Sequence, residues 1–339
     1  MKILNKSIIF ILIISMLMAG FCFRVSALVI YENNFGFEVN TSEHEAILVS
    51  YVGDEAFVQI PDYFHGYPVA VIDRNAFSGN KMIRGIVFSD TNTTVEEYAF
   101  MNCSSLESVY IPENVTNFGD RVFANCTSLQ NVTMLSDIVS MPTNMFSGCA
   151  SLSNLIINDQ IAEFSYGCFK GCSSLTDLGF VSNGALIQSY AFSGTGAESV
   201  DLCDELVAIP NYAFTNCSNL HYVTIPKSVV LIQPRAFDFE NVTIGCYYDS
   251  YAYSFAKENG YSYELLDEFM LGDTNGDDCI SITDVTLIQC WLVDLKPIDE
   301  LHLLAADVDM NGVVDINDAT AIQFYLAQFE VEYPIGQLI

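Results

Sequence analysis

Two acidic segments near the C-terminal end of the sequence carry the residue types best suited to chemistry. One runs from Asp273 to Asp284 and the other from Asp307 to Asp318. In each segment, oxygen-bearing side chains stand at positions 1, 3, 5, 9 and 12 of a twelve-residue stretch. A hard divalent cation such as Ca²⁺ takes about six to eight oxygen ligands, and a tightly wound loop with this spacing supplies them. The tandem pattern therefore predicts two calcium loops.

Each loop is followed by an amphipathic helix, which has to hold the last ligand of the loop in place. The apolar face expected for the first helix consists of Val285, Ile288, Trp291 and Leu292. The face expected for the second helix consists of Ala319, Ile322, Tyr325, Leu326 and Phe329. An EF-hand would have Glu at position 12 and a further helix before the loop. Both loops have Asp at position 12, and no helix is predicted immediately before Asp273.

This duplicated loop and helix resembles a type I dockerin over about residues 270–330. In that family, two calcium ions shape a small three-helix module that docks onto a cohesin domain of a scaffoldin, building a cellulosome. The resemblance implies ligands from the side chains of Asp273, Asn275, Asp277, Ser281, Asp284, Asp307, Asp309, Asn311, Asp315 and Asp318, and from the backbone carbonyls of Cys279 and Val313. Asp278 stands where Gly is usual. Because Asp tolerates a positive φ, we expect weaker calcium binding in loop one and not its loss.

The resemblance also implies which positions contact the cohesin. They are Ile282, Thr283, Gln289 and Cys290 in the first half, and Ile316, Asn317, Gln323 and Phe324 in the second. Ile and Gln recur in both halves. This recurrence leaves open a two-fold binding mode in which either half serves.

The chain before these loops is organised by a repeat with a period of 23 residues. Its clearest column is Phe77, Phe100, Phe123, Phe146, Phe169, Phe192, Phe214 and Phe237. The unit I-x-x-x-A-F-x-x-C-x-x-L-x-x-V-x-I-P predicts a solenoid of about eight turns, in which like side chains stack inside. The alternating L-x-x-V-x-I part predicts a strand. The A-F-x-x-C-x-x-L part has near-helical spacing and predicts a short helical or 3₁₀ turn on the opposite side.

The repeat resembles the BspA-type leucine-rich repeat of bacterial surface and secreted proteins over about residues 45–264. The predicted fold is therefore a β-rich leucine-rich-repeat solenoid followed by a small all-α calcium-binding dockerin. The expected segments are a signal peptide at 1–27, N-terminal cap strands at 28–71, repeats with a closing cap at 72–264, and the dockerin at 265–339 with its core at 270–330. Gly194–Ala197 replaces the cysteine-containing turn of the sixth unit, where we expect a kink or bulge.

The sequence contains eleven cysteines, most of them in the repeats. One column consists of Cys103, Cys126, Cys149 and Cys172, each 23 residues from the next. We interpret these side chains as buried, reduced thiols that pack as small hydrophobic groups. Disulfides between turns are the alternative, although parallel Cβ vectors on stacked turns suit a disulfide poorly. Cys168 and Cys172 form the pair most open to bridging.

Net charge and an N-terminal targeting signal indicate the partners and the location of the protein. The chain has 12 Lys and Arg against 42 Asp and Glu, a formal net charge of −30, which excludes nucleic acid and anionic membrane surfaces as partners. Lys2 and Lys6, the apolar run at 8–18 and the small residues at 25–27 are typical of a secretory signal peptide. We therefore predict a secreted, extracellular protein at a cell-surface cellulosome, with no membrane insertion after signal cleavage.

Catalytic residues are not indicated. The four histidines, His44, His65, His221 and His302, are scattered and lack a nucleophile motif such as G-x-S-x-G. The predicted function is that of a non-catalytic cellulosomal component in polysaccharide breakdown. Its dockerin binds a scaffoldin cohesin with calcium, and its repeats recognise a protein or polysaccharide.

Two alternatives to this function stay open. One is an enzyme associated with glycoside hydrolases that has an unrecognised site, and the other is a freestanding adhesin. On the strand face of the repeats, only Tyr110 and Tyr222 are aromatic, so a solvated face without a ligand is as consistent with the sequence as a binding face.

Overall fold

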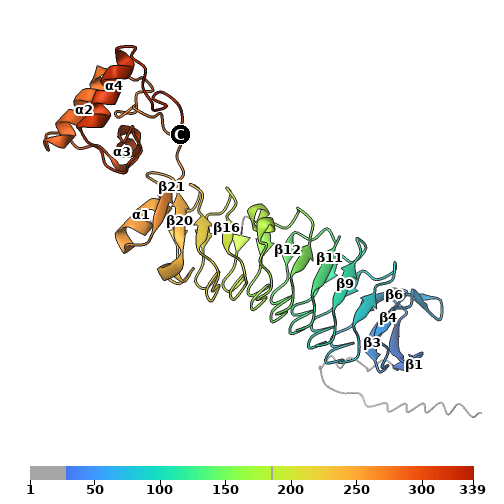
Figure 1. Cartoon of the computed structure of the whole chain (residues 1–339). Coiled ribbons are helices and arrows are strands. Elements are labelled where there is room, and N and C mark those ends of the chain that lie inside the picture. The colour runs from blue at the N-terminus through green and yellow to red at the C-terminus, as the bar shows by residue number, and fades with distance from the viewer. Residues whose placement is uncertain (1–27, 185) are drawn as a thin grey trace, which may run out of the picture.

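The computed structural model describes residues 28–184 and 186–339, which form an elongated solenoid followed by a small helical module (Figure 1). The predicted signal peptide at 1–27 lies outside the described residues. The solenoid has about 9 turns at 23-residue spacing, and this confirms the predicted fold class. Among the described residues, no helix is long and apolar enough to cross a membrane.

Most turns contribute two short parallel strands, one to each of two columns. The first column contains β4 (Phe57–Gln59), β7 (Gly85–Val87), β9 (Ser108–Ile111), β11 (Asn131–Met134), β13 (Asn154–Ile156), β16 (Ser199–Asp201), β18 (Tyr222–Thr224), β20 (Thr243–Cys246) and β21 (Tyr263–Leu265). The second contains β3 (Glu45–Tyr51), β6 (Tyr67–Ile72), β8 (Thr94–Val95), β10 (Asn117–Phe118), β12 (Ser140–Met141), β14 (Glu163–Phe164), β15 (Leu186–Ile187), β17 (Ala208–Ile209) and β19 (Leu231–Ile232). β1 (Ile30–Glu32), β2 (Phe35–Asn40) and β5 (Tyr63–Phe64) pair antiparallel at the N-terminal end.

A column of stacked phenylalanine rings fills the interior. The ring centroids of successive members lie 4.8 Å apart at Phe77–Phe100 and 5.8 Å apart at Phe169–Phe192, and the rings are nearly parallel. The spacing matches the separation of neighbouring strands, about 4.8 Å, because the period of 23 residues returns each ring to the same place one turn later. No turn can bury its ring without both neighbours.

The A-F-x-x-C-x-x-L segment forms successive hydrogen-bonded turns, so the expected helical or 3₁₀ turn was wrong. Alternate amides donate to the next turn of the solenoid: Phe77 N–H bonds to the Ala99 carbonyl at 2.8 Å, and Gly79 N–H to the Met101 carbonyl at 2.7 Å. Left-handed residues flank the Phe, at Asn75 (φ 61°) and Gly79 (φ 73°). A helix would need these amides for its own carbonyls, whereas here they join neighbouring turns.

The irregularity expected at Gly194–Ala197 lies mainly on the strand side. The turn itself is regular, since Gly194 N–H donates to the Thr215 carbonyl at 2.8 Å. One unit earlier, the 3₁₀ helix η1 (Gly179–Asn183) replaces a strand, and the first column is interrupted between β13 and β16. The second column is interrupted nearby, between β15 and β17.

The cysteine column forms a ladder of thiol hydrogen bonds. Each thiol lies near the carbonyl oxygen of the Phe one turn earlier, at 3.1 Å for Cys103 and Phe77 and 3.2 Å for Cys217 and Phe192. In the sixth unit Thr195 stands in place of the cysteine, and its hydroxyl donates to the carbonyl of Phe192 in its own turn at 3.0 Å, which interrupts the ladder. All ten described cysteines are free, in agreement with the reduced interpretation.

The helical module has its own core. It contains α2 (Ile282–Leu292), α3 (Glu300–Ala306) and α4 (Ile316–Leu326), and α2 packs against α4. The expected apolar faces are correct at their centres, where the side chains are buried. Three residues expected on these faces, Leu292, Tyr325 and Phe329, are exposed. Leu287 and Ala321, which were not expected there, are buried. In so small a module, each helix is covered along a narrow stripe only.

Glu300, the first residue of α3, connects the module to the closing cap of the solenoid. Its carboxylate accepts hydrogen bonds from Lys257 Nζ (2.7 Å) and the Tyr253 hydroxyl (2.8 Å) on α1 (Tyr251–Asn259), and from the Tyr263 hydroxyl on β21. Burial alone would raise the pKa of Glu300, but these donors outweigh it and hold the pKa below its ordinary value. The contact therefore favours the ionised carboxylate.

The first prediction concerns the thiols. Exposed Cys279 and half-buried Cys290 should react with iodoacetamide in the native protein, and the eight buried cysteines only after unfolding. Burial excludes the reagent and disfavours the thiolate, since it raises the pKa of Cys149 to about 12. Mass spectrometry of alkylated peptides checks this. Disulfide-linked peptides, or rapid labelling of the column, would contradict it.

The second prediction concerns the contact between the two parts of the chain. Glu300→Gln keeps the shape of the side chain but removes its charge, so at pH 7 it should broaden the distance distribution measured by small-angle X-ray scattering. Because the folded-state pKa of Glu300 is lowered, the native contact should also loosen as pH falls through that pKa. Glu258→Gln, an exposed position on α1, is the matched control. Indistinguishable profiles for both variants would show that Glu300 does not hold the module.

Candidate calcium loops and docking surface

The second acidic loop brings carboxylates together between α3 and α4. Carboxylate oxygens of Asp307, Asp309 and Asp318 all lie within 4.8 Å of one another. Asp318 is fully buried, and its two oxygens accept from the amides of Val308 and Asp315, each at 2.8 Å. These two bonds fix the last carboxylate of the loop at the beginning of α4. They also leave its remaining lone pairs available inside the loop.

The first loop has the same framework between the solenoid and α2. Asp284 is fully buried, and its oxygens accept from the amides of Thr274 and Ser281, each at 2.9 Å. Asp273 is nearly as buried and accepts from the amides of Gly276 (2.8 Å) and Asp278 (2.7 Å). The sequence repeat in this region is thus a repeat in hydrogen bonding as well.

The two loops differ at position 6. Asp278 adopts φ 60° where loop two has Gly312 at φ 86°, so Asp takes the left-handed conformation that the sequence analysis expected of it. The Asp277 carboxylate accepts from the Cys279 amide at 3.1 Å. Across residues 28–184 and 186–339, loop two is the one place where three metal-ligating side chains of the His, Cys, Asp or Glu type converge. Weaker calcium binding in loop one stays a prediction.

The chemistry of the two loops fits a hard divalent cation. Their side-chain donors are oxygens, which calcium prefers to the nitrogen and sulfur ligands of softer metals. Within the part of the chain that the structure describes, no ion pair compensates Asp273, Asp284 or Asp318. Burial raises the pKa of Asp318, against the lowering effect of its amide donors, and neighbouring Asp309 adds to the rise. A bound cation would supply the missing positive charge.

The residues predicted to contact a cohesin lie on the solvent side of α2 and α4. Ile282 is 61% exposed and Ile316 54%. Thr283, Gln289, Asn317, Gln323 and Phe324 are exposed as well, and Cys290 is half-buried. The sequence analysis missed the exposed apolar residues Val293 and Leu295, which follow α2. They lie outside the positions that the resemblance to a type I dockerin implies.

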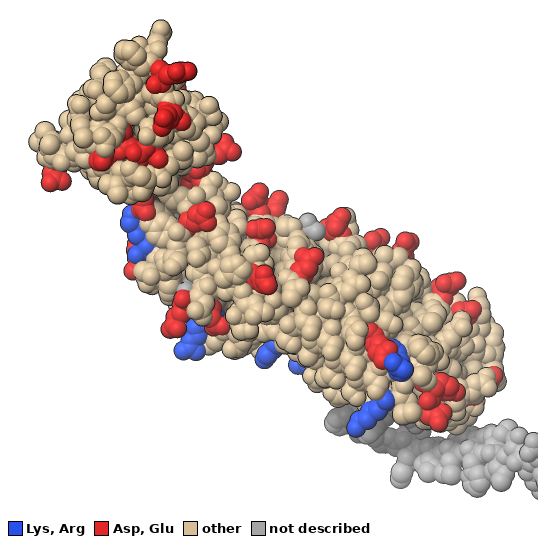
Figure 2. Space-filling model, viewed as in Figure 1, with Lys and Arg blue, Asp and Glu red and all other residues tan. Residues whose placement is uncertain are grey.

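The strand face of the repeats is a second exposed surface. Val87 pairs with Tyr110, and Tyr110 with Thr133, so that outward side chains line up across successive strands. The sequence analysis recognised Tyr110 and Tyr222 here but missed Phe57, which is exposed on β4. Acidic side chains are spread along the molecule, whereas the few Lys and Arg side chains gather along the lower edge of the solenoid in Figure 2.

The four histidines lie apart from one another and do not form a site. His65 contacts Glu32 at 3.1 Å in the N-terminal cap, and His302 contacts Asp299 at 2.7 Å at the start of α3. His44 packs beside Tyr67, while His221 lies in the repeats. This scatter agrees with the prediction from the sequence.

Two families match this chain. The BspA type Leucine rich repeat region matches in 6 copies over residues 70–195 and 140–246, which together span more than half of the chain. The Dockerin type I domain matches residues 271–327. Both are non-catalytic modules, in agreement with the prediction that the chain is not an enzyme. No curated protein matches.

Several solved bacterial structures are similar to the chain. A leucine-rich repeat protein from T. pallidum is 17% identical, with 70% of this chain and 99% of that chain covered and a TM-score of 0.46. One from Eubacterium ventriosum is 27% identical, with 61% and 48% covered and a TM-score of 0.43. A leucine rich cell surface protein from Faecalibacterium prausnitzii is 20% identical, with 65% and 89% covered and a TM-score of 0.35.

The third prediction is that calcium folds the helical module. Without the ion, the buried carboxylates of both loops repel one another, so a chelator should expose the amides of residues 270–330 to hydrogen exchange and leave the repeats protected. Asp318→Ala should have the same effect on loop two even with calcium present. Asp294→Asn, an exposed acid just after α2, is the control. Equal exchange with and without the chelator would contradict the prediction.

Proposed function

The chain belongs to the BspA-type leucine-rich repeat family and carries a type I dockerin domain, and from this premise we propose a secreted, non-catalytic adaptor. Its dockerin binds a cohesin of a scaffoldin in a calcium-dependent manner. Its repeats hold a protein or polysaccharide ligand during polysaccharide breakdown. The predicted signal peptide at 1–27 supports export to an extracellular, cell-surface cellulosome.

The observation that carries the proposal is the matched geometry of the two helix starts. α2 begins with a capping box of Ser281 and Asp284, and α4 with one of Asp315 and Asp318. The second residue of each box, Asp284 or Asp318, is also the last residue of an acidic loop. An exposed Ile follows the cap at each start, so a folded loop fixes the direction of an apolar side chain toward a partner.

Two calcium ions are part of the proposal. The first takes Asp273, Asn275, Asp277, Ser281, Asp284 and the Cys279 carbonyl, and the second takes Asp307, Asp309, Asn311, Asp315, Asp318 and the Val313 carbonyl. The ions supply charge compensation that orders both loops. We keep the segment boundaries at 71/72 and 264/265 as proposals. A freestanding adhesin, in which the calcium module only stabilises the end of the solenoid, remains the second candidate because the module contacts the cap through Glu300.

The fourth prediction separates these functions. Ile282→Asp and Ile316→Asp should each weaken cohesin binding by less than about threefold, because the other half still serves. The double variant should weaken it by about 5- to 150-fold, because whichever half faces the cohesin then lacks its apolar contact, and such a contact at an interface centre contributes about 1–3 kcal/mol. Calorimetry with a panel of type I cohesins measures both effects.

Val139→Asp is the matched control, because Val139 is 63% exposed and lies in the solenoid, outside the helical module. Loss of all binding in one single variant would refute the dual mode. Full binding by the double variant would refute the proposed surface, and no binding of any tested cohesin by the folded wild-type chain would favour the adhesin.

A further inference from the structure

Phe57 extends across the backbone of the neighbouring turn. It pairs in register with Gly85 of β7. A Cβ atom at Gly85 would lie 2.9 Å from Cδ1 and 3.1 Å from Cε1 of the Phe57 ring, so the glycine makes room for the ring. Gly85 is buried, whereas Phe57 is 74% exposed. One edge of the ring therefore lies against β7, and most of the ring is open to solvent.

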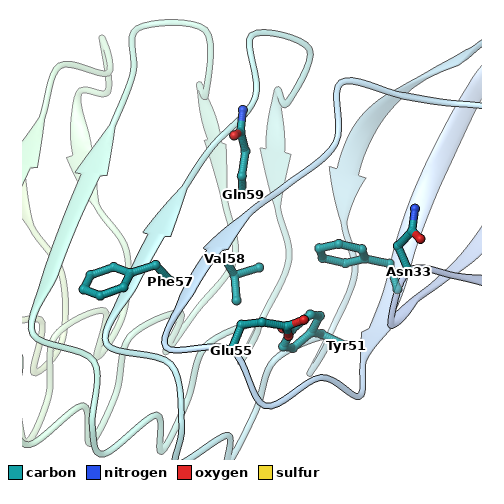
Figure 3. Close-up of a pocket in the computed structure, with 7 residues that line it drawn as sticks. Asn33, Tyr51, Glu55, Phe57, Val58 and Gln59 are labelled. Atoms are coloured by element: carbon teal, nitrogen blue, oxygen red, sulfur yellow. The ribbon is translucent and has the colours of Figure 1, made fainter.

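Polar side chains surround a hollow on the other side of β4. The hollow measures about 160 Å³ and is lined by Asn33, Phe35, Tyr51, Glu55, Phe57, Val58 and Gln59. Glu55 accepts hydrogen bonds from the Tyr51 hydroxyl and from Asn34 Nδ2 (3.1 Å), which hold its carboxylate in place. In Figure 3, Phe57 points away from Tyr51 and Glu55, and Gln59 stands at the far end of the same strand. β4 thus presents a flat ring with hydrogen-bonding groups on both sides.

A glycine also lies beside an aromatic ring near the other end of the first column, although Tyr222 is half-buried and pairs in register with Thr243 and not with the glycine. A Cβ atom at Gly245 of β20 would lie 2.5 Å from Oη and 2.9 Å from Cζ of Tyr222 on β18. Polar partners are again close, since the Thr224 hydroxyl donates to Asp201 at 2.6 Å. Tyr110, on β9 between these two places, lies more than 4 Å from a Cβ atom placed at Gly85, the glycine in its paired strands. A glycine in contact with an aromatic ring of this face is therefore a local feature, not a property of the repeat.

The chemistry of these places fits a sugar ring. A pyranose has an apolar C–H face that packs on an aromatic ring and a rim of hydroxyls that bond to amides and carboxylates. The formal net charge of −30 disfavours polyanionic chains such as polyuronates.

We propose that the strand face of the solenoid binds a neutral polysaccharide, with one sugar ring stacked on Phe57 and a second on Tyr222. Gln59 and Glu55 bond to the hydroxyls of the first sugar. The proposal rests on the proposed role of the repeats in recognition and names its ligand class. The two rings are roughly seven turns apart, about 34 Å at about 4.8 Å per turn, so only a long chain reaches both. Long chains should therefore bind more tightly than short oligosaccharides.

The test is affinity electrophoresis of the full chain with calcium, in gels that contain hydroxyethyl cellulose, xyloglucan, glucomannan or polygalacturonate. At least one of the three neutral polymers should retard the wild-type protein, and polygalacturonate should not. Phe57→Leu keeps the apolar character but removes the flat ring, and should weaken binding about tenfold. Gly85→Ala keeps the ring but places a Cβ atom against its edge, so that the ring has to move aside, and should act in the same direction.

Tyr110→Leu is the matched control, since it removes an exposed aromatic from the same face without a glycine beneath, and it should change binding less than about twofold. Thermal melts verify that each variant is folded. If Gly85→Ala does not fold, Phe57→Leu still tests the proposal. Phe57 is exposed, so its replacement should leave the fold intact. No retardation by any neutral polymer, retardation by polygalacturonate alone, or equal loss in Tyr110→Leu and Phe57→Leu would overturn the proposal.

Cohesin binding by the same samples separates this inference from the proposed function. If the chain binds cohesin but no polysaccharide, the result supports the adaptor role and refutes the proposed sugar site. If the chain binds polysaccharide through Phe57 but no cohesin, the result supports the proposed sugar site and refutes the adaptor role.

Discussion

Every turn of the solenoid depends on its neighbours, because the polar groups of its backbone and the ring of its Phe find their partners there. The amide of Phe77 bonds to a carbonyl of the next turn, and its own carbonyl accepts from the Cys103 thiol of that turn. Removing one turn would leave buried donors and acceptors unpaired on both sides. The nearly constant period is the consequence: most turns have 23 residues, and the 22-residue spacing from Phe192 to Phe214 still keeps the Phe192 amide bonded to the Ala213 carbonyl at 2.9 Å.

The same dependence makes the two ends special. At the N-terminal end, the antiparallel pairing of β1 and β2 with β3 covers the second column, while β4 is the edge strand of the first. At the C-terminal end, α1 and β21 close the stack, and their Tyr253, Lys257 and Tyr263 hold Glu300 of the helical module. Two of the features proposed for binding thus lie where the repeat stops: the exposed ring of Phe57 at one end, and the acidic loops beyond the other.

The features predicted from the sequence are those whose residue pattern recurs in it. Phe at one period predicted the solenoid, and oxygens at fixed positions predicted two acidic loops whose carboxylates converge in the case of Asp307, Asp309 and Asp318. Contacts without recurrence were not predicted. Glu300 contacts residues of α1 that are distant from it in the sequence, and no repeated pattern links them. Phe57 lies in the cap, where the repeat pattern no longer indicates which side chains point outward. The form of the turns was missed because spacing does not show whether an amide bonds within its own turn or to the next.

The central claim is that this chain joins a recognition solenoid to a calcium-dependent docking module. The most direct measurement is titration calorimetry of the wild-type full chain against type I cohesins, with calcium and again with a chelator. The account predicts a complex of one chain to one cohesin that forms with calcium and is lost with the chelator, while the circular dichroism of the repeats is retained. Equal cohesin affinity in the two conditions would contradict it.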